Sequence, residues 1–318
     1  MTSTVPHPPP SRVVGSDPPV VPVVVDVDGV PMSGLLAAVH DPRAVVVALH
    51  GGATTSKYFD CPGHPDLSLL RAGMAAGFTV LALDRPGYGS SRPFVDRFGD
   101  AAVRVEAMFA AIDGHLGAAP RGAGIFLVAH SAGSHLGVRM AADDRGSRFL
   151  GLELAGTGRV RQPDAETALS VPKPSGRAVA ELLWQPHHLY PHELVGGGPI
   201  VAGGPRFEGA QMQEWTEVHF PRLAARTTIP VRFSVGQYER VWRNDPAGLA
   251  DIADLFAVAP RVVLNVQPHS GHNLSLGYTA RAYHLKLLSF VEECAVARES
   301  GEFSGPARQL DGATLILP

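Results

Sequence analysis

The sequence predicts an α/β fold in which a mostly parallel central sheet is covered by helices on both faces. Three observations support this prediction. Short Val-rich runs alternate with helical periodicity between residues 44 and 154, an irregular segment rich in proline and aromatic residues follows, and the alternation returns between residues 229 and 296. Strands that alternate with helices form parallel sheets with crossover helices. We therefore expect one α/β core interrupted by one insertion.

The expected elements follow from periodicity and from turn residues. An alternating or continuous apolar run predicts a strand, and apolar positions three and four residues apart predict a helix. The first two strands are expected to pair as an antiparallel hairpin through the turn at Asp28-Gly29. The expected strands are residues 20–27, 32–39, 44–49, 78–83, 124–129, 149–154, 229–235 and 261–266, and the expected helices are residues 66–76, 96–116, 134–142, 246–256 and 279–296.

Composition excludes several classes of protein. The chain has 318 residues, of which 45% are hydrophobic and 18% charged, so it is long enough to bury a substantial core. A net charge of -3 gives no basic field, so we expect no nucleic-acid partner. No apolar run reaches the about 18 residues that a membrane span needs. Cys61 and Cys294 are too few for a disulfide framework or a zinc site. We expect a cytoplasmic protein without cofactor or metal, and the oligomeric state stays open, with a homodimer as one candidate.

Domain boundaries follow from changes in composition. Residues 1–19 are rich in proline and lack the apolar core of a secretory signal, so we expect a disordered lead. Residues 20–156 and 227–297 are expected to form the α/β core. Residues 157–226, with eight prolines, form the insertion, and residues 298–318 form a polar tail.

A serine lies where the strand at residues 124–129 turns into a helix, in the run His130-Ser131-Ala132-Gly133. Small residues two positions on either side, Ala129 and Gly133, let strand and helix approach closely and direct the serine hydroxyl out of the sheet edge. This segment resembles the nucleophile elbow, G-x-S-x-G, of the α/β-hydrolase family, with Ala129 at the first glycine. On its own, so short a motif also fits an ordinary turn.

Two further segments carry the same resemblance. The strand at residues 44–49 runs into His50-Gly51-Gly52, and the strand at residues 78–83 ends in Asp84-Arg85-Pro86-Gly87-Tyr88-Gly89, which is similar to the family's D-x-P-G-x-G loop. The resemblance implies the α/β-hydrolase fold. It also implies that the backbone N–H groups of Gly52 and Ala132 form the oxyanion hole. For Asp84 and Arg85 it implies a structural role, in which they satisfy backbone groups around the elbow.

A carboxylate and a histidine follow later strands in the order that the family uses. Glu239 matches the final position of the family's G-x-x-E pattern after the strand at residues 229–235, and His272 follows Gly271 after the strand at residues 261–266. Serine becomes a good nucleophile only when an imidazole takes its proton, and a carboxylate must orient that imidazole. Ser131, Glu239 and His272 are therefore the candidate catalytic residues.

Other residues compete for two of these roles. Asp245 precedes a proline and is expected to cap the next helix, whereas Asp251 falls within that helix. Glu153 lies inside a predicted strand, so its side chain should point to one face of the sheet. The predicted Glu239 contact with His272 Nδ1 is about 2.6 to 3.2 Å long. His269 is the alternative to His272 as the base.

The insertion lies where the family carries a cap over its active site. Trp184, Tyr190, Phe207 and Trp215 would be costly to expose to water, which argues against a loose loop. The histidines at positions 187, 188 and 192 lack the spacing of a metal site. We expect an apolar, largely aromatic substrate site, whose predicted lining is Tyr58, Phe59, His130, Trp184, Tyr190 and Trp215.

The resemblance implies a serine hydrolase that cleaves a carboxylic ester or thioester of a hydrophobic small molecule through an acyl-enzyme. Ser131 argues against epoxide and haloalkane hydrolysis, which use an aspartate nucleophile in this fold. Two alternatives stay open. One is a lyase, a cyclase or a C–C bond hydrolase with the same triad, and the other is a ligand-binding homologue without catalysis.

Overall fold

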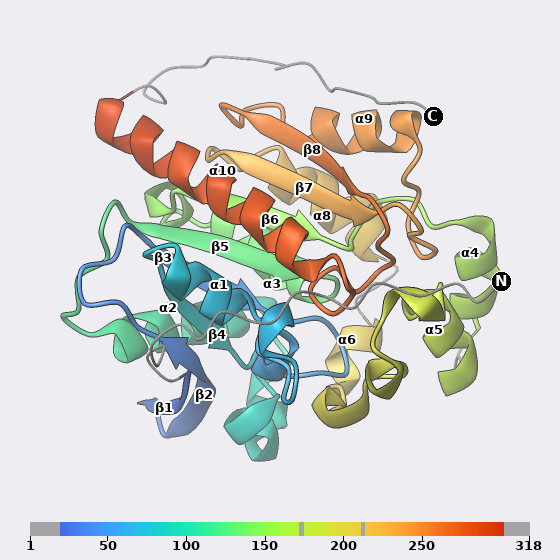
Figure 1. Cartoon of the computed structure of the whole chain (residues 1–318), viewed down its shortest axis with the longest axis horizontal. Helices are drawn as coiled ribbons and strands as arrows, with labels where there is room; N and C mark the ends of the chain where they lie inside the picture. Colours follow the sequence, from blue (N-terminus) through green and yellow to red (C-terminus); the bar gives the residue numbers. More distant parts are fainter. Residues whose placement is uncertain (1–19, 172–174, 211–213, 302–318) are drawn as a thin grey trace, which may run out of the picture.

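The computed structural model describes residues 20–171, 175–210 and 214–301 (Figure 1). The predicted lead at residues 1–19 and the tail beyond residue 301 lie outside these ranges. Within them, eight strands form one sheet in the order β1-β2-β4-β3-β5-β6-β7-β8. β2 runs antiparallel to β1 and to β4, and all other neighbours are parallel. The predicted fold class is confirmed.

The strands are β1 (Val21–Val27), β2 (Val30–Ala37), β3 (Val45–Leu49), β4 (Thr79–Leu83), β5 (Ile125–His130), β6 (Gly151–Ala155), β7 (Val231–Gly236) and β8 (Val262–Gln267).

Helices cover both faces of the sheet and create two hydrophobic cores. One face packs against α2 (Ala101–Leu116), α3 (Gly133–Ala141), α8 (Phe220–Ala224) and α9 (Pro246–Leu255), and the other against α1 (Leu69–Ala75) and α10 (Ala280–Ser300). The sequence of β3 is continuously apolar because both faces of the strand are buried. Its odd-numbered residues, from Val45 to Leu49, enter the first core, whereas Val46 and Ala48 enter the second.

The segment between β6 and β7 contains α4 (Pro163–Leu169), α5 (Gly176–Leu183) and α6 (Arg206–Ala210), and these helices lie beyond the carboxyl ends of the parallel strands (Figure 1). The last part of the segment, from Trp215 onward, packs against the sheet. A π-helix, Trp215–His219, leads directly into α8, and Trp215 and Phe220 are buried in the core on the α3 side of the sheet. The part of this segment that lies over the strand ends therefore precedes Trp215.

Three predicted helix boundaries are wrong, each for a local reason. The predicted helix at residues 96–116 is divided into η3 (Gly89–Phe98), a 3₁₀ segment, and α2, because the Asp100 side chain accepts a hydrogen bond from Ala102 N and caps α2. Likewise Ser68 caps α1, which begins three residues later than predicted. α10 continues to Ser300, four residues beyond the prediction, and ends at Gly301 with a φ of 72°.

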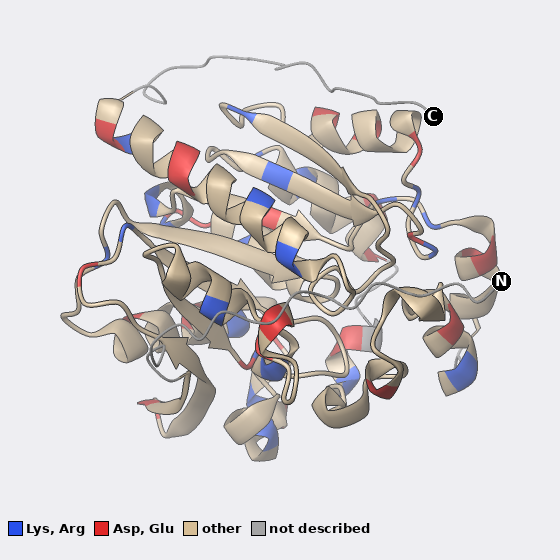
Figure 2. Ribbon diagram, viewed as in Figure 1, with Lys and Arg blue, Asp and Glu red and all other residues tan. Residues whose placement is uncertain are grey.

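Charged residues are interspersed over helices and loops and do not gather on one face (Figure 2). This distribution agrees with the small net charge of -3. Within the described ranges, no helix combines the length and the apolar composition that crossing a membrane requires.

Candidate active site

Ser131 lies at the sharp turn between β5 and α3 and has a left-handed backbone, with φ of 50°. A non-glycine residue in this conformation costs about 1 to 3 kcal/mol, so its neighbours must hold it there. The Ser131 N–H donates to the Ala155 carbonyl at 2.8 Å. A Cβ at Gly133 would lie 2.5 and 2.6 Å from the carbonyl oxygens of His50 and Leu49, so only glycine lets α3 begin this close to β3.

Ser131, His272 and Glu239 form a hydrogen-bonded chain. His272 Nε2 lies 3.0 Å from Ser131 Oγ, and His272 Nδ1 lies 3.0 Å from both carboxylate oxygens of Glu239. The imidazole is 1% exposed and Glu239 is 4% exposed, whereas Ser131 is partly exposed. Because the carboxylate can only accept, it places the ring proton on Nδ1 and leaves Nε2 free to accept the serine proton.

The competing residues make other contacts. Asp245 accepts a hydrogen bond from Gly248 N and caps α9, as predicted. Glu153 is buried, forms an ion pair with Arg232 at 2.9 Å and accepts a hydrogen bond from the Tyr283 hydroxyl. Burial raises the pKa of Glu153, and the Arg232 charge opposes that shift. Of the four carboxylates considered, Glu239 alone hydrogen-bonds to His272.

The other candidate base is also placed elsewhere. The backbone N–H of His269 donates to the side chain of Gln237, and its imidazole is exposed.

His130 precedes the serine and supports the histidine loop. Its ring stacks on Tyr58 with 4.4 Å between centroids, and its Nε2–H donates to the backbone carbonyl of His272 at 3.1 Å. Burial lowers the pKa of His130 to about 3, so the ring is neutral. The residue next to Ser131 therefore fixes the backbone that carries His272.

Gly52 and Ala132 lie against each other beside Ser131. A Cβ at Gly52 would lie 3.6 Å from Ala132 Cβ. Within the part of the chain that the structure describes, neither of their backbone N–H groups has an acceptor, whereas the next N–H, that of Ala53, donates to the Tyr88 hydroxyl at 3.1 Å. Two unpaired donors are thus available to an anionic oxygen at this place.

Asp84 and Arg85 tie the loop after β4 to the loop after β3. Asp84 Oδ1 accepts from Ser56 N at 2.7 Å, and Arg85 Nη2 donates to the Gly51 carbonyl at 2.8 Å. The Arg85 backbone N–H donates to His50 Nε2 at 3.0 Å. These contacts hold the turn that carries Gly52, so the predicted structural contacts are present, but at the loop after β3 and not at the elbow itself.

A cavity of about 160 Å³ opens above Ser131, and its lining includes Gly52, His130 and His272. Two aromatic side chains, Tyr58 and Trp184, contribute to its wall. The remaining apolar lining is aliphatic and comes mostly from α5 and the turns that follow it: Val179, Ala180, Leu183, Ile200, Val201 and Leu276.

The prediction that Phe59, Tyr190 and Trp215 line this cavity is wrong. Phe59 is buried with its ring edge-on to Tyr58. The Tyr190 hydroxyl accepts from Asn273 N at 3.3 Å and so braces the loop of His272 from outside the cavity. Trp215 stacks on His135 of α3 with 4.1 Å between centroids. All three are buried, as the cost of exposing aromatic rings requires, but they are buried in the hydrophobic cores.

Glu208, on α6, was not predicted from the sequence. Its Oε2 lies 3.6 Å from the position of a Cβ on Gly52 and accepts a hydrogen bond from the Tyr88 hydroxyl at 2.8 Å. Its Oε1 forms an ion pair with Arg85 at 2.5 Å. No sequence motif marks this glutamate. In the described residues, no group of three or more His, Cys, Asp or Glu side chains is placed to hold a metal ion.

This sheet, with a strained serine after β5, defines an α/β-hydrolase fold. The profile of the alpha/beta hydrolase family matches residues 46–282, which is more than half of the chain, so the chain belongs to that family. No curated protein sequence matches the chain.

Several solved structures are similar to the chain. A monoglyceride lipase variant from Saccharomyces cerevisiae has a TM-score of 0.64 at 15% identity, over 90% of this chain and 97% of that one. A carboxyl esterase from Bacillus coagulans has a TM-score of 0.61 at 17% identity, over 86% and 98%. The thioesterase domain of the curacin biosynthetic pathway has a TM-score of 0.56 at 17% identity, over 86% and 99%. At such identities the likeness shows the fold.

The close approach at the elbow gives a first prediction. Gly133→Ala is expected to lower the free energy of unfolding by about 1 to 3 kcal/mol, because its Cβ would meet two backbone oxygens. Urea unfolding measures this loss. Helix propensity alone would predict the opposite result, because alanine favours a helix more than glycine does. Gly176→Ala on α5 is the matched control, because its Cβ meets open space and stability should be kept. Equal stability of the Gly133 variant and the wild type would contradict the description of the elbow.

Proposed function

We propose that the protein is a serine hydrolase that cleaves a carboxylic ester or thioester through an acyl-enzyme. The observation that carries the proposal is the hydrogen-bonded chain from Ser131 through His272 to Glu239. Beside it lie the N–H groups of Gly52 and Ala132, which have no acceptor among the residues that the structure describes. Each of these groups has one role in hydrolysis through an acyl-enzyme, which is a reaction typical of the α/β-hydrolase family.

In the first half of the reaction, Ser131 Oγ attacks the carbonyl carbon while His272 Nε2 takes the serine proton. Glu239 stabilises the imidazolium that forms. The carbonyl oxygen becomes an oxyanion, which accepts hydrogen bonds from the N–H groups of Gly52 and Ala132. His272 then gives its proton to the leaving alcohol or thiol as the bond to the carbonyl carbon breaks, which leaves an ester on Ser131.

In the second half, His272 removes a proton from a water molecule, and the resulting hydroxide adds to the acyl carbon. The oxyanion forms again at the same two N–H groups. His272 returns the proton to Ser131 Oγ as the acid leaves. The enzyme is regenerated, and the net reaction consumes one water per ester.

We further propose that residues 157–226 include a cap and that it contributes the acyl site. The support is that α5 and the turns after it supply Val179, Leu183 and Ile200 to the cavity above Ser131. An aliphatic wall of this kind favours an unbranched hydrophobic acyl chain. A cavity of about 160 Å³ limits its length.

The test of the nucleophile is covalent labelling. A fluorophosphonate probe should label the wild type, and Ser131→Ala should lose the label together with at least about 10³-fold in kcat on 4-nitrophenyl esters. The substitution removes only a hydroxyl that projects from the turn, so the unfolding midpoint should change little. Retention of the label by the variant would move the nucleophile elsewhere. Product analysis distinguishes hydrolysis, which yields acid and alcohol, from elimination.

Glu239→Gln should keep the fold and lower kcat by orders of magnitude, because an amide cannot stabilise the imidazolium and can favour the wrong tautomer of His272. Asp245→Asn is the matched control: it changes a carboxylate on the neighbouring segment that caps α9 and makes no contact with His272. The measurement is kcat on 4-nitrophenyl butyrate for both variants. A similar kcat for Glu239→Gln and the wild type would exclude Glu239 from the reaction.

The cavity predicts a preference for medium acyl chains. Across 4-nitrophenyl esters from acetate to decanoate, kcat/KM should peak between butyrate and octanoate. Ala180→Phe, which fills the cavity, should move the peak to shorter chains, whereas Ala178→Phe on the same helix, outside the lining, should not. A flat profile for the wild type would show that the aliphatic wall does not contact the acyl chain.

A further inference from the structure

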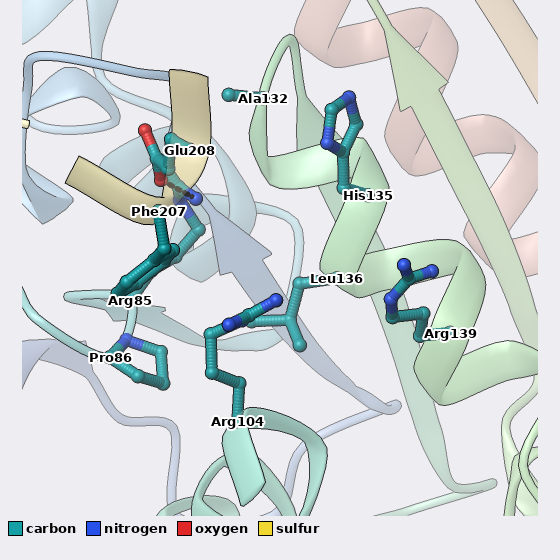
Figure 3. A pocket seen from close by; sticks show the side chains of 9 residues that line it. All are labelled: Arg85, Pro86, Arg104, Ala132, His135, Leu136, Arg139, Phe207 and Glu208. Atoms are coloured by element: carbon teal, nitrogen blue, oxygen red, sulfur yellow. Dashed lines mark hydrogen bonds and ion pairs between the residues drawn. The ribbon is translucent and has the colours of Figure 1, made fainter. Parts of the chain in front are cut away.

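A second, smaller pocket lies between α2, α3, the loop after β4 and α6 (Figure 3). Its volume is about 30 Å³, which is the space of about one water molecule or one small polar group. Ala132, whose N–H lies beside Ser131, is part of the lining. The charged and aromatic side chains in the lining are Arg85, Arg104, His135, Arg139, Phe207 and Glu208.

The lining is rich in guanidinium groups. Arg85 is 5% exposed, and two of its nitrogens are used, one for Glu208 and one for the Gly51 carbonyl. Its Nε is buried and has no hydrogen-bond acceptor within the described residues. Arg104 donates to the Phe98 carbonyl. Figure 3 shows Arg104 on α2 and Arg139 on α3, with Arg85 joined to Glu208.

Arg139 lacks a balancing carboxylate. Its guanidinium carbon lies 5.1 Å from the centre of the Trp215 ring, and no carboxylate in the described part of the chain is within ion-pair distance of it. Burial lowers the pKa of Arg139, and it lowers the pKa of His135 to about 3, so that the imidazole adds no charge. The lining therefore has three positive groups and one negative group. Partly desolvated positive charge of this kind is stabilised by a bound anion.

We propose that this pocket binds a carboxylate of the substrate, so that the preferred ester carries a negative charge near its reacting carbonyl. The inference rests on the proposed hydrolase function and adds the class of substrate. A carboxylate is a small planar group that accepts paired hydrogen bonds from a guanidinium fork, and it suits a pocket of this size better than a phosphate. Ala132 lines the pocket and lies next to Ser131, so the charged group and the ester bond can belong to one small molecule.

The position of Glu208 fits this inference. Its carboxylate already pairs with Arg85 at the edge of the pocket. Arg85 is thus largely neutralised, and Arg139, which has no ion-pair partner in the described part of the chain, is the guanidinium left for a substrate carboxylate.

The first test compares pairs of esters in which a methyl group removes the negative charge of one member. One pair, mono-4-nitrophenyl glutarate and its methyl ester, places the charge on the acyl side. The other, the butyrate esters of 4-hydroxybenzoate and of methyl 4-hydroxybenzoate, places it on the leaving group. After subtraction of the uncatalysed rate, kcat/KM of the wild type should favour the anionic member of at least one pair by about tenfold or more, which is about 1.4 kcal/mol.

Variants of Arg139 test whether the preference for anionic esters comes from this pocket. Arg139→Gln should reduce the ratio of anionic to neutral kcat/KM by about tenfold, and Arg139→Lys should restore part of it. Arg222→Gln on α8, an exposed arginine outside the pocket, should leave the ratio unchanged. A wild type that hydrolyses the neutral esters and shows no charge preference in either pair would overturn the inference and leave the proposed function intact. The unfolding midpoint of each variant shows whether it folds.

A binding measurement tests the pocket even if the protein hydrolyses none of these esters. Calorimetric titration of monomethyl glutarate into Ser131→Ala should show binding that is about tenfold weaker in Ser131→Ala/Arg139→Gln. No binding, or binding that Arg139→Gln does not weaken, would overturn the inference even if no ester were turned over. Binding of inorganic phosphate in preference to the carboxylate would overturn the choice of ligand.

Discussion

The left-handed backbone of Ser131 is the constraint on which the rest of the site depends. A serine adopts this conformation only where its surroundings supply the free energy, and here the Ala155 carbonyl and the close approach of Gly133 to β3 do so. The same turn positions His272. His130 holds the backbone carbonyl of His272, and Ser131 contacts its imidazole, so two adjacent residues fix both ends of one histidine. The turn at Ser131 therefore orders the serine and His272 together.

The fold could be predicted from the alternation of strands and helices, and the three-residue chain from its resemblance to motifs of the α/β-hydrolase family; the geometry of parallel strands explains why these residues meet. The carboxyl ends of such strands meet at one edge, so residues just after β5, β7 and β8 come together whatever their distance in sequence. Glu239 follows β7, and His272 follows β8. Local capping was harder to predict: Asp100 and Ser68 decide where α2 and α1 begin, and apolar periodicity extends across both boundaries.

For the aromatic residues of the segment between β6 and β7, burial could be predicted from the sequence but the packing partners could not. Apolar periodicity and composition state that Trp215 and Tyr190 must be buried, but they do not state against what. Trp215 is carried by the turn into α8 to the α3 side of the sheet, whereas Trp184, at the end of α5, reaches the cavity. That difference depends on the path of an irregular chain. Glu208 is a similar case, because its partner Arg85 is 123 residues away and no repeating geometry links the two.

Ala132 lines the smaller pocket and Gly52 the larger one, and Arg85, beside both residues, has an electrostatic effect beyond its hydrogen bonds. A buried guanidinium beside Gly51 favours negative charge on a nearby oxygen, because the field of a charge is weakly screened in a site that excludes water. Glu208 opposes that field, since its carboxylate lies beside Gly52. Arg85 belongs to the loop after β4 and Glu208 to α6, so their ion pair also joins the segment over the strand ends to the core.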